Sequence, residues 1–339
     1  MNRISLCSLA LLTIVISVND ASAWNAVGHM TVAKIAYDDL DDKSRVALFN
    51  LLKQHPHFKD YLSASKPSDV DNEVQWVILR SAVWSDWIRG SRKDSRGVSI
   101  NTYHRGEEHY VNIPLIDPKD EKFFAGKTLI DPDLPNIVTA LKQRANEVKM
   151  KNAAAEDRAI AACWLFHLVG DIHQPLHNVA YFSSDAAFRK GDLGGNIFGI
   201  KADGRKWKLH QYWDDILGYD SDYNDDSGNH QGKLYREAVK LAESLRGLKL
   251  TDADLDKLAT NKTFESWSRE SFELAKSVGY LKGDGSGLLK AVAIPFKAPI
   301  PDEADEVGKE YIQRARATAE KQAVLAGKRL AARVKLLVN

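Results

Sequence analysis

Apolar residues recur at helical spacing along most of this chain. In Trp24–Tyr37 they place Val32, Ile35 and Ala36 on one face, and a similar stripe runs through Asp41–Gln54. Spacing of this kind predicts amphipathic helices that bury their apolar faces against one another. The same reasoning predicts helices over Asp69–Ile88, Leu134–Met150, Glu156–His173, Glu237–Leu245, Phe264–Val278 and Glu303–Val338, the last range holding one helix or two.

Two stretches depart from this helical pattern. Val98–Pro114 has the residues of short strands and predicts a hairpin. Ile197–Leu209 predicts a second hairpin, because Asp203-Gly204 at its centre is a favoured two-residue turn. No internal repeat or linker divides the chain, so we expect a mainly α protein with a single helical domain. Loops are expected at Gly90–Gly97, Ser183–Asn196 and Gly283–Pro301.

The first 23 residues have the pattern of a secretory signal peptide. A basic start at Asn2-Arg3 precedes an apolar run over residues 4–18, and Ala21-Ser22-Ala23 forms an A-x-A cleavage signal. We therefore expect cleavage between Ala23 and Trp24, a secreted or periplasmic protein, and residues 24–339 as its functional domain. The apolar run is shorter than a typical membrane span, which disfavours the alternative of an uncleaved anchor.

Composition and charge narrow the function only slightly. The chain has 339 residues and a formal net charge of +1, and losing Arg3 and Asp20 with the leader leaves that charge unchanged. A balance so close to neutral argues against broad electrostatic binding to duplex nucleic acid, but not against a local patch. Cleavage also removes Cys7 and leaves Cys163 without a partner for an internal disulfide. Stability is therefore expected to come from the core and from bound metal.

The run Trp164–His177, WLFHLVGDIHQPLH, carries the clearest chemical signal. His167 and Asp171 are four residues apart, which places an imidazole and a carboxylate side by side on one face of a helix. Pro175 ends that helix because it lacks an N–H and clashes with the preceding turn. His177 then leaves the helical register and can reach a second centre.

A second pair of the same kind follows in KLHQYWDDIL. His210 and Asp214 are again four residues apart. Core packing explains two such pairs poorly, because buried carboxylates are rare unless they are paired or bound to metal. Together with His177 between them, the two pairs predict a zinc-type site with more than one ion.

Further motifs connect this site to a known family. The chain resembles the secreted zinc-dependent single-strand nuclease and 3′-nucleotidase family, which is related to zinc phospholipase C. The resemblance implies a mainly α fold of that type, with small β-hairpins near the active-site cleft. It covers nearly all of the chain after residue 23, through a C-terminal segment around Gly327 and these motifs in family order: W-N-x-x-G-H, W-S-D-W-I-R, H-Y-V-N, H-L-V-G-D-I-H-Q-P-L-H, G-D-L-G-G-N and L-H-x-x-W-D.

The resemblance implies three zinc ions as cofactors. Nitrogen and oxygen donors of this kind suit zinc, and each site has too few protein ligands to be closed to water or phosphate. Asp171 would bridge the first and third ions. The implied ligands are Asp86, His109, His167 and Asp171 for the first ion, His177, His210 and Asp214 for the second, and the Trp24 amine and carbonyl with His29 and Asp171 for the third.

The implied activity is endonucleolytic hydrolysis of RNA and single-stranded DNA, with 3′-nucleotidase activity, by a hydroxide that bridges two zinc ions. Arg89 would bind a phosphate oxygen, and Asn196 would position phosphate or water with Asp192 in support. Tyr110 would stack on a base, while Asn112 stands where fungal members carry an acidic base-reading residue. We expect a monomer with no stable protein partner.

Plainer interpretations remain for several residues. Arg89 could form a surface ion pair, and Tyr110 could pack in the core. A zinc phospholipase C acting on lipid head groups and a non-catalytic zinc-binding protein are the alternative functions. Outside the metal site we expect His173 to support its surroundings, Trp76, Trp84 and Trp164 to lie in the core, and His55, His57, His104 and His230 to be solvated at the surface.

Overall fold

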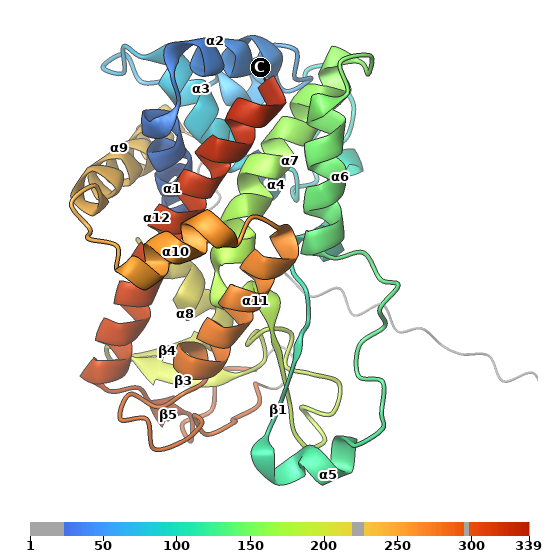
Figure 1. Cartoon of the computed structure of the whole chain (residues 1–339), viewed down its shortest axis with the longest axis vertical. Coiled ribbons are helices and arrows are strands. Elements are labelled where there is room, and N and C mark those ends of the chain that lie inside the picture. The colour runs from blue at the N-terminus through green and yellow to red at the C-terminus, as the bar shows by residue number, and fades with distance from the viewer. Residues whose placement is uncertain (1–23, 219–226, 295–297, 339) are drawn as a thin grey trace, which may run out of the picture.

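A computed structural model of the chain describes residues 24–218, 227–294 and 298–338. Helices make up most of this part, and the few strands form two small sheets (Figure 1). The expected mainly α fold is therefore confirmed. The expected signal peptide lies outside the described residues. Within them, no helix is both long enough and apolar enough to cross a membrane.

Helix α7 (Ala155–His173) runs through the centre of the molecule. Nearly every residue from Ala159 onward is buried, because this segment is apolar around its whole circumference rather than along one stripe. Helices α6 (Ile137–Lys149), α11 (Phe264–Leu274) and α12 (Lys309–Val338) pack around it (Figure 1). The carboxyl end of α7, which carries the histidines and Asp171, is thus held rigidly inside the core.

Helix α1 (Ala26–Asp39) packs against α12 and α9 (Gly228–Leu245). The approach to α12 is close, since a Cβ atom at Gly327 would lie 2.5 Å from the Ile35 side chain. Asn25 caps α1 by accepting a hydrogen bond from the Gly28 amide at 3.2 Å. This packing fixes the start of α1, and with it His29, beside α7.

The predicted helix over Asp69–Ile88 is divided into α3 (Glu73–Ser81) and α4 (Trp84–Trp87). The break leaves the Ala82 carbonyl outside the helical hydrogen-bond ladder, where it accepts a bond from His167 Nδ1 at 2.8 Å. The prediction of helical structure is therefore confirmed for residues 73–81 and 84–87, while the break between them was not predicted. The division also turns the Asp86 side chain toward α7.

The hairpin predicted in Val98–Pro114 is absent from this described segment. Two 3₁₀ turns, η2 (Ile100–Tyr103) and η3 (Gly106–His109), take its place. They lead to β1 (Pro114–Ile116), which pairs in parallel with β2 (Ala180–Phe182) far along the chain. A strand therefore does form at the end of this segment, but it pairs with a distant part of the chain and not with the neighbouring residues.

The second predicted hairpin is confirmed. Strands β3 (Gly199–Ala202) and β4 (Arg205–Lys208) pair antiparallel around Asp203-Gly204, whose φ angles of 50° and 71° are those of a tight two-residue hairpin turn. Strand β5 (Asp305–Glu306) adds to β3 in parallel. The range Glu303–Val338, expected to hold one helix or two, contains β5 and then the single helix α12, which begins at Lys309.

The remaining elements complete the domain. The sequence did not predict α10, and α9 begins earlier than expected. Trp76, Trp84 and Trp164 lie in the core as expected, with at most 2% of their surface exposed. The elements not yet described are α2 (Asp42–Leu52), η1 (Phe58–Leu62), η4 (Pro118–Asp120), α5 (Glu121–Phe124), η5 (Pro175–Asn178), α8 (Leu209–Asp215), α10 (Asp252–Thr260) and η6 (Ala275–Gly279).

Candidate metal centre

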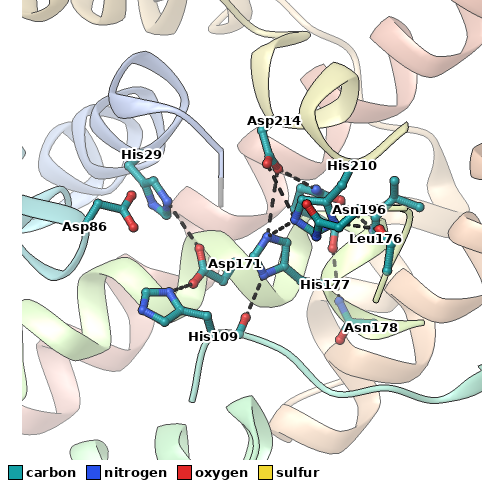
Figure 2. A network of polar contacts seen from close by, with 12 residues as sticks. His29, Asp86, His109, Asp171, Leu176, His177, Asn178, Asn196, His210 and Asp214 are labelled. Carbon is teal, nitrogen blue, oxygen red and sulfur yellow. Dashed lines mark hydrogen bonds and ion pairs between the residues drawn. The ribbon is translucent and has the colours of Figure 1, made fainter. Parts of the chain in front are cut away.

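Histidines and carboxylates from six elements meet at the end of α7 and form two groups. Figure 2 shows His29, Asp86 and His109 of the first group around Asp171, with His177, His210 and Asp214 of the second group beside them. Every member of both groups is at most 5% exposed. Three sets offer nitrogen and oxygen atoms close enough together to hold an ion, and the first two share His167: His29, His167 and Asp171; Asp86, His109 and His167; His177, His210 and Asp214.

Asp171 lies at the centre of the first group. Its Oδ1 is 3.2 Å from His29 Nε2, while its Oδ2 is 2.9 Å from His109 Nδ1 and 3.2 Å from His167 Nε2. The two carboxylate oxygens therefore face different histidines. A carboxylate in this position can contact two ions at once.

The orientation of His167 is fixed by the break between α3 and α4. Its Nδ1 donates to the Ala82 carbonyl at 2.8 Å, so the Nε2 lone pair faces the group. That Nε2 lies 3.0 Å from His109 Nδ1 and 3.6 Å from Asp86 Oδ1. Two nitrogens on one tetrahedral zinc are about 3.3 Å apart, so this spacing fits a shared ion.

The second group shows the same arrangement more sharply. His177 Nδ1 donates to the His109 carbonyl and His210 Nδ1 donates to the Gly194 carbonyl, both at 2.6 Å. Their Nε2 atoms then face each other at 3.2 Å with no proton to share, beside Asp214 at 3.5 Å from His210 Nε2. Two lone pairs in such contact repel each other unless a cation lies between them. The donor set therefore fits a metal.

Protonation favours the same interpretation. Burial opposes ionisation of Asp171, but His167, His109 and His29 together hold its pKa well below the usual range. Burial raises the pKa of Asp214 well above its ordinary value. The pKa of His210 is lowered to about 3, by burial and by His177, so this imidazole is neutral at pH 7 and cannot compensate the Asp214 charge. A bound cation would supply the positive charge that balances an ionised Asp214.

Several buried atoms lack the hydrogen bond that burial normally requires. Within the described residues, His29 Nε2 and Asp171 Oδ1 lie 3.2 Å apart without forming a hydrogen bond. Asp86 Oδ1 also lacks a hydrogen bond, although it forms an ion pair with Arg89 at 2.8 Å. All three atoms belong to the first group. Buried polar atoms without hydrogen bonds are expected at a place where an ion would bind them.

The main chain next to Trp24 contacts a residue of each group. The Trp24 side chain is fully buried, and the amide of the next residue, Asn25, donates to the Asp214 carbonyl at 3.2 Å. The Asn25 carbonyl accepts the His29 amide at 3.1 Å, one helical turn further along. The main chain that follows Trp24 is thus fixed to both Asp214 and His29.

Comparison with known proteins matches this architecture to one family. A model of the S1/P1 nuclease family matches residues 24–339. The chain belongs to the S1/P1 nuclease family. Endonuclease 2 of Arabidopsis thaliana is 27% identical over 203 residues, which cover 56% of this chain and 54% of that protein. Nuclease P1 of Penicillium citrinum is 23% identical over 205 residues, 57% of this chain and 58% of that protein. These matched regions span little more than half of each relative's length.

The family membership confirms the resemblance drawn from the motifs. In this member of the family, Arg89 lies at the edge of the first group. Its Nη2 is 2.8 Å from Asp86 Oδ1 and 3.3 Å from His109 Nδ1, and its side chain is 11% exposed. After burial, Arg89 is the main cause that lowers the pKa of His109, to about 3. A guanidinium in this position is close enough to contact an anion held by the same centre.

The G-D-L-G-G-N loop lies against the second group. Leu193 and Gly194 have φ angles of 58° and 65°, and this left-handed backbone brings the Gly194 carbonyl to His210. Asn196 is buried next to them, with Nδ2 donating to the Leu193 carbonyl at 2.9 Å (Figure 2). The Leu193 side chain is 39% exposed, an apolar surface that the sequence did not single out.

Tyr110 and Asn112 lie in the extended segment between His109 and β1, and both are half-buried. The Tyr110 carbonyl accepts the Ile137 amide at 3.0 Å, which fixes the backbone of this segment to the start of α6. The two side chains are therefore neither fully packed in the core nor fully exposed. Contact with substrate remains an expectation for both.

Two residues that hold the centre in place were missed from the sequence. Gln174 is fully buried and donates to Asp214 Oδ1 at 2.7 Å. Arg329 on α12 donates to His173 Nε2 at 2.9 Å and pairs with Glu270 at 2.8 Å. Gln174 lies inside the H-Q-P-L-H motif, which was its only signal. Arg329 carried none, because its partners are far away in the sequence.

The structure corrects the prediction for histidines outside the centre. His57 accepts a bond from Trp84 Nε1 at 3.0 Å and lies 3.3 Å from Asp94 Oδ2. These contacts draw it into the core behind α4, so its polar neighbours in sequence were misleading. Of the four histidines expected at the surface, three are buried and the last is half-buried: His55, His57, His230 and His104.

Asp192 anchors the G-D-L-G-G-N loop. Its Oδ1 accepts the Tyr181 amide at 2.8 Å and its Oδ2 accepts the Tyr280 hydroxyl at 2.6 Å. The carboxylate is fully buried. Burial raises its pKa to about 6, although these hydrogen bonds and the Gly195 amide oppose the rise.

Replacing the Asp192 carboxyl should reduce the pH dependence of the free energy of unfolding between pH 4 and pH 7. Between pH 4 and pH 6 folded Asp192 binds more protons than unfolded Asp192, so its ionisation destabilises the fold as pH rises. A pKa of about 6 against an ordinary 3.8 corresponds to about 3 kcal/mol. We expect Asp192→Asn to lose that fall between pH 4 and pH 7. Denaturant unfolding of the zinc-free proteins at both pH values measures it, and equal falls in both proteins would contradict the assignment.

Proposed function

We propose that this S1/P1 nuclease is a secreted zinc-dependent endonuclease that hydrolyses RNA and single-stranded DNA and removes the phosphate of 3′-nucleotides. The observation that carries the proposal is the pair of facing Nε2 atoms of His177 and His210 beside the Asp171 cluster. The two groups are joined directly, since His177 donates to the carbonyl of His109. Such adjacency supports a multi-ion phosphoesterase rather than a single structural site.

Three zinc ions are proposed, in the arrangement that the family resemblance implies. Both oxygens of Asp171 take part, which is consistent with their facing different histidines. The second set supplies only three protein ligands, so that site would keep a position for water or phosphate, and expansion to five ligands would admit one at the other two sites. The proposed ligands are Asp86, His109, His167 and Asp171, then His177, His210 and Asp214, then His29 and Asp171 with the amine and carbonyl of Trp24.

Bound zinc ions would lower the pKa of water and polarise the phosphate. The protein's own groups serve this chemistry by their protonation states. Asp171 is held ionised, so it acts as a ligand and not as a proton donor. Arg89 is placed to bind a phosphate oxygen as negative charge grows, and Asn196 to orient the phosphate or water. No side chain is required as a general acid in this scheme.

Localisation and size follow from the proposed processing. Cleavage after Ala23 would free the Trp24 amine in an exported protein of residues 24–339. We propose that this form is a monomer without a membrane anchor. We propose that Tyr110 and Asn112 are the residues that contact the base.

One assay separates this function from its alternatives. Mature protein is incubated with zinc and single-stranded DNA, RNA, 3′-AMP or phosphatidylcholine, before and after chelation. We expect hydrolysis of the first three substrates, loss on chelation and recovery with zinc. Hydrolysis of phosphatidylcholine alone would indicate a phospholipase C. Tight zinc binding without any turnover would indicate a non-catalytic binding protein.

A further inference from the structure

A protrusion of the fold lies at the end of the β1/β2 ribbon, away from the helical body. We define this tip as residues 117–130 and 183–190. Figure 1 shows α5, its helix, at the lower end of the molecule with β1 leading toward it. A small hydrophobic cluster separate from the main core holds the tip in place, formed by Phe124, Ala180 and Phe182.

The ribbon connects the tip directly to the metal centre. The Val111 amide donates to the His177 carbonyl at 2.8 Å, and pairing continues until the Asp117 amide meets the Phe182 carbonyl at 2.9 Å. Phe182 lies five positions beyond His177, and a chain of that length spans at most about 16 Å when fully extended. A polymer bound at the centre could therefore extend to the tip, and a mononucleotide is the substrate that tests the centre without it.

An exposed aromatic ring lies on the tip among cations. Phe123 is 40% exposed. Lys127 Nζ lies 3.7 Å from the centre of its ring, and the Arg189 guanidinium carbon lies 5.6 Å from it. Phe124 supports the ring from its edge at 4.9 Å between centroids. A firmly held aromatic face with cations beside it is the arrangement on which single-stranded bases stack.

The charges of the tip favour a polyanion. Of its four carboxylates, Asp120 is buried and accepts the Ser184 amide and hydroxyl. Asp117 is half-buried, accepts the Tyr181 hydroxyl and pairs with Lys119 at 3.0 Å. The other two, Glu121 and Asp185, are exposed. All five cations are exposed, namely Lys119, Lys122, Lys127, Arg189 and Lys190. Cations therefore outnumber carboxylates at the exposed surface of the tip, in a chain that is nearly neutral overall.

We propose that the tip is a second contact for single-stranded nucleic acid, in which a base stacks on Phe123 and Lys127 and Arg189 bind the flanking phosphates. The inference rests on the proposed nuclease function, since the strand is the same one that the metal centre would cleave. Base stacking is stronger than an exposed cation–π contact, so the flexible Lys127 side chain yields its place on the ring to a base. The tip thus serves long substrates only.

The test compares a short and a long substrate. For Phe123→Ala and for Lys127→Ala we expect an unchanged kcat/KM with 3′-AMP and a KM for a 20-nucleotide single strand raised about tenfold for the former. Lys127→Ala should also reduce the salt dependence of strand binding by about 0.7 in the log–log slope. A matched pair, Phe49→Ala and Lys53→Ala, removes a similar ring and cation, 5.2 Å apart, from α2 at the opposite end of Figure 1. These two control variants should leave both kcat/KM with 3′-AMP and KM for the 20-nucleotide strand unchanged.

Each other outcome has a separate meaning. An unchanged KM for the long strand would overturn the proposal. Equal losses on both substrates would also overturn it, because the tip would then act through the folding of the centre. If the wild type cleaves no nucleic acid, fluorescence anisotropy with a nuclease-resistant phosphorothioate strand still tests the tip by itself. Tip-dependent binding to vesicles with phosphatidylserine, without binding to the strand, would replace the nucleic acid with a lipid surface.

Discussion

Asp171→Asn is expected to abolish nearly all hydrolysis of single-stranded DNA, with kcat/KM lower by a factor on the order of 10³ or more. The reason is geometric, because one oxygen of Asp171 faces His29 and the other faces His109 and His167. An asparagine keeps the shape but loses the charge and one oxygen donor. Two ions should therefore be weakened together. Steady-state kinetics and elemental analysis of zinc per chain measure both effects.

Zinc content distinguishes a bridging role from a general loss of structure. The group of His177, His210 and Asp214 does not include Asp171, so about one ion per chain should remain. Asp254→Asn is the matched control, since Asp254 is also buried but contacts only groups outside the metal centre among those described, namely Thr251 at the start of α10 and Lys321 at 3.0 Å. It should keep full zinc content and activity. Near-normal turnover by Asp171→Asn would rule out the bridging role.

Local spacing predicted the parts of the centre that lie on one helix. The pairs His167–Asp171 and His210–Asp214 both sit one turn apart on α7 and α8, as the spacing of four requires. Pro175 ends α7, and His177 does turn toward the second pair. These predictions needed no information about distant parts of the chain, because a helix fixes the relation between residues i and i+4.

Contacts between distant segments account for what spacing could not predict. The partner of His167 Nδ1 is the carbonyl of Ala82, which becomes available only because the helix before α4 is broken. The partner of β1 is β2, about 65 residues later, so the segment around His109 could not form the hairpin that its strand-like residues suggested. His57 was assigned to the surface for the same reason, since Trp84 and Asp94 become its neighbours only after folding.

The site residues contributed from α1, α4 and η3 show this limit most clearly. His29, Asp86 and His109 are commonplace in isolation, and family resemblance alone singled them out. The structure brings all three around Asp171, through packing of α1 and α4 on α7. Gln174 lies inside the recognised motif and donates to Asp214, but it was not singled out from the sequence as a site residue.

A free amine at Trp24 is expected to be essential for full zinc content. The buried Trp24 side chain and the bond from the Asn25 amide to the Asp214 carbonyl hold this main-chain segment against both groups. A terminal amine can coordinate zinc, whereas an amide nitrogen that carries residue 23 is a poor ligand. Protein that begins at Ala23 should therefore bind about two ions, and its kcat/KM should fall by about 10- to 100-fold or more.

Comparison of three mature forms isolates the role of the main chain. Protein that begins at Trp24 should bind three ions by elemental analysis. A Trp24→Phe form that begins at the same position keeps the amine and the carbonyl, so it should also bind three ions even where the smaller ring costs stability through a cavity. If the form that begins at Ala23 holds as much zinc as the form that begins at Trp24, the amine is not a ligand. In that case His29 and Asp171 must complete the third site with water alone.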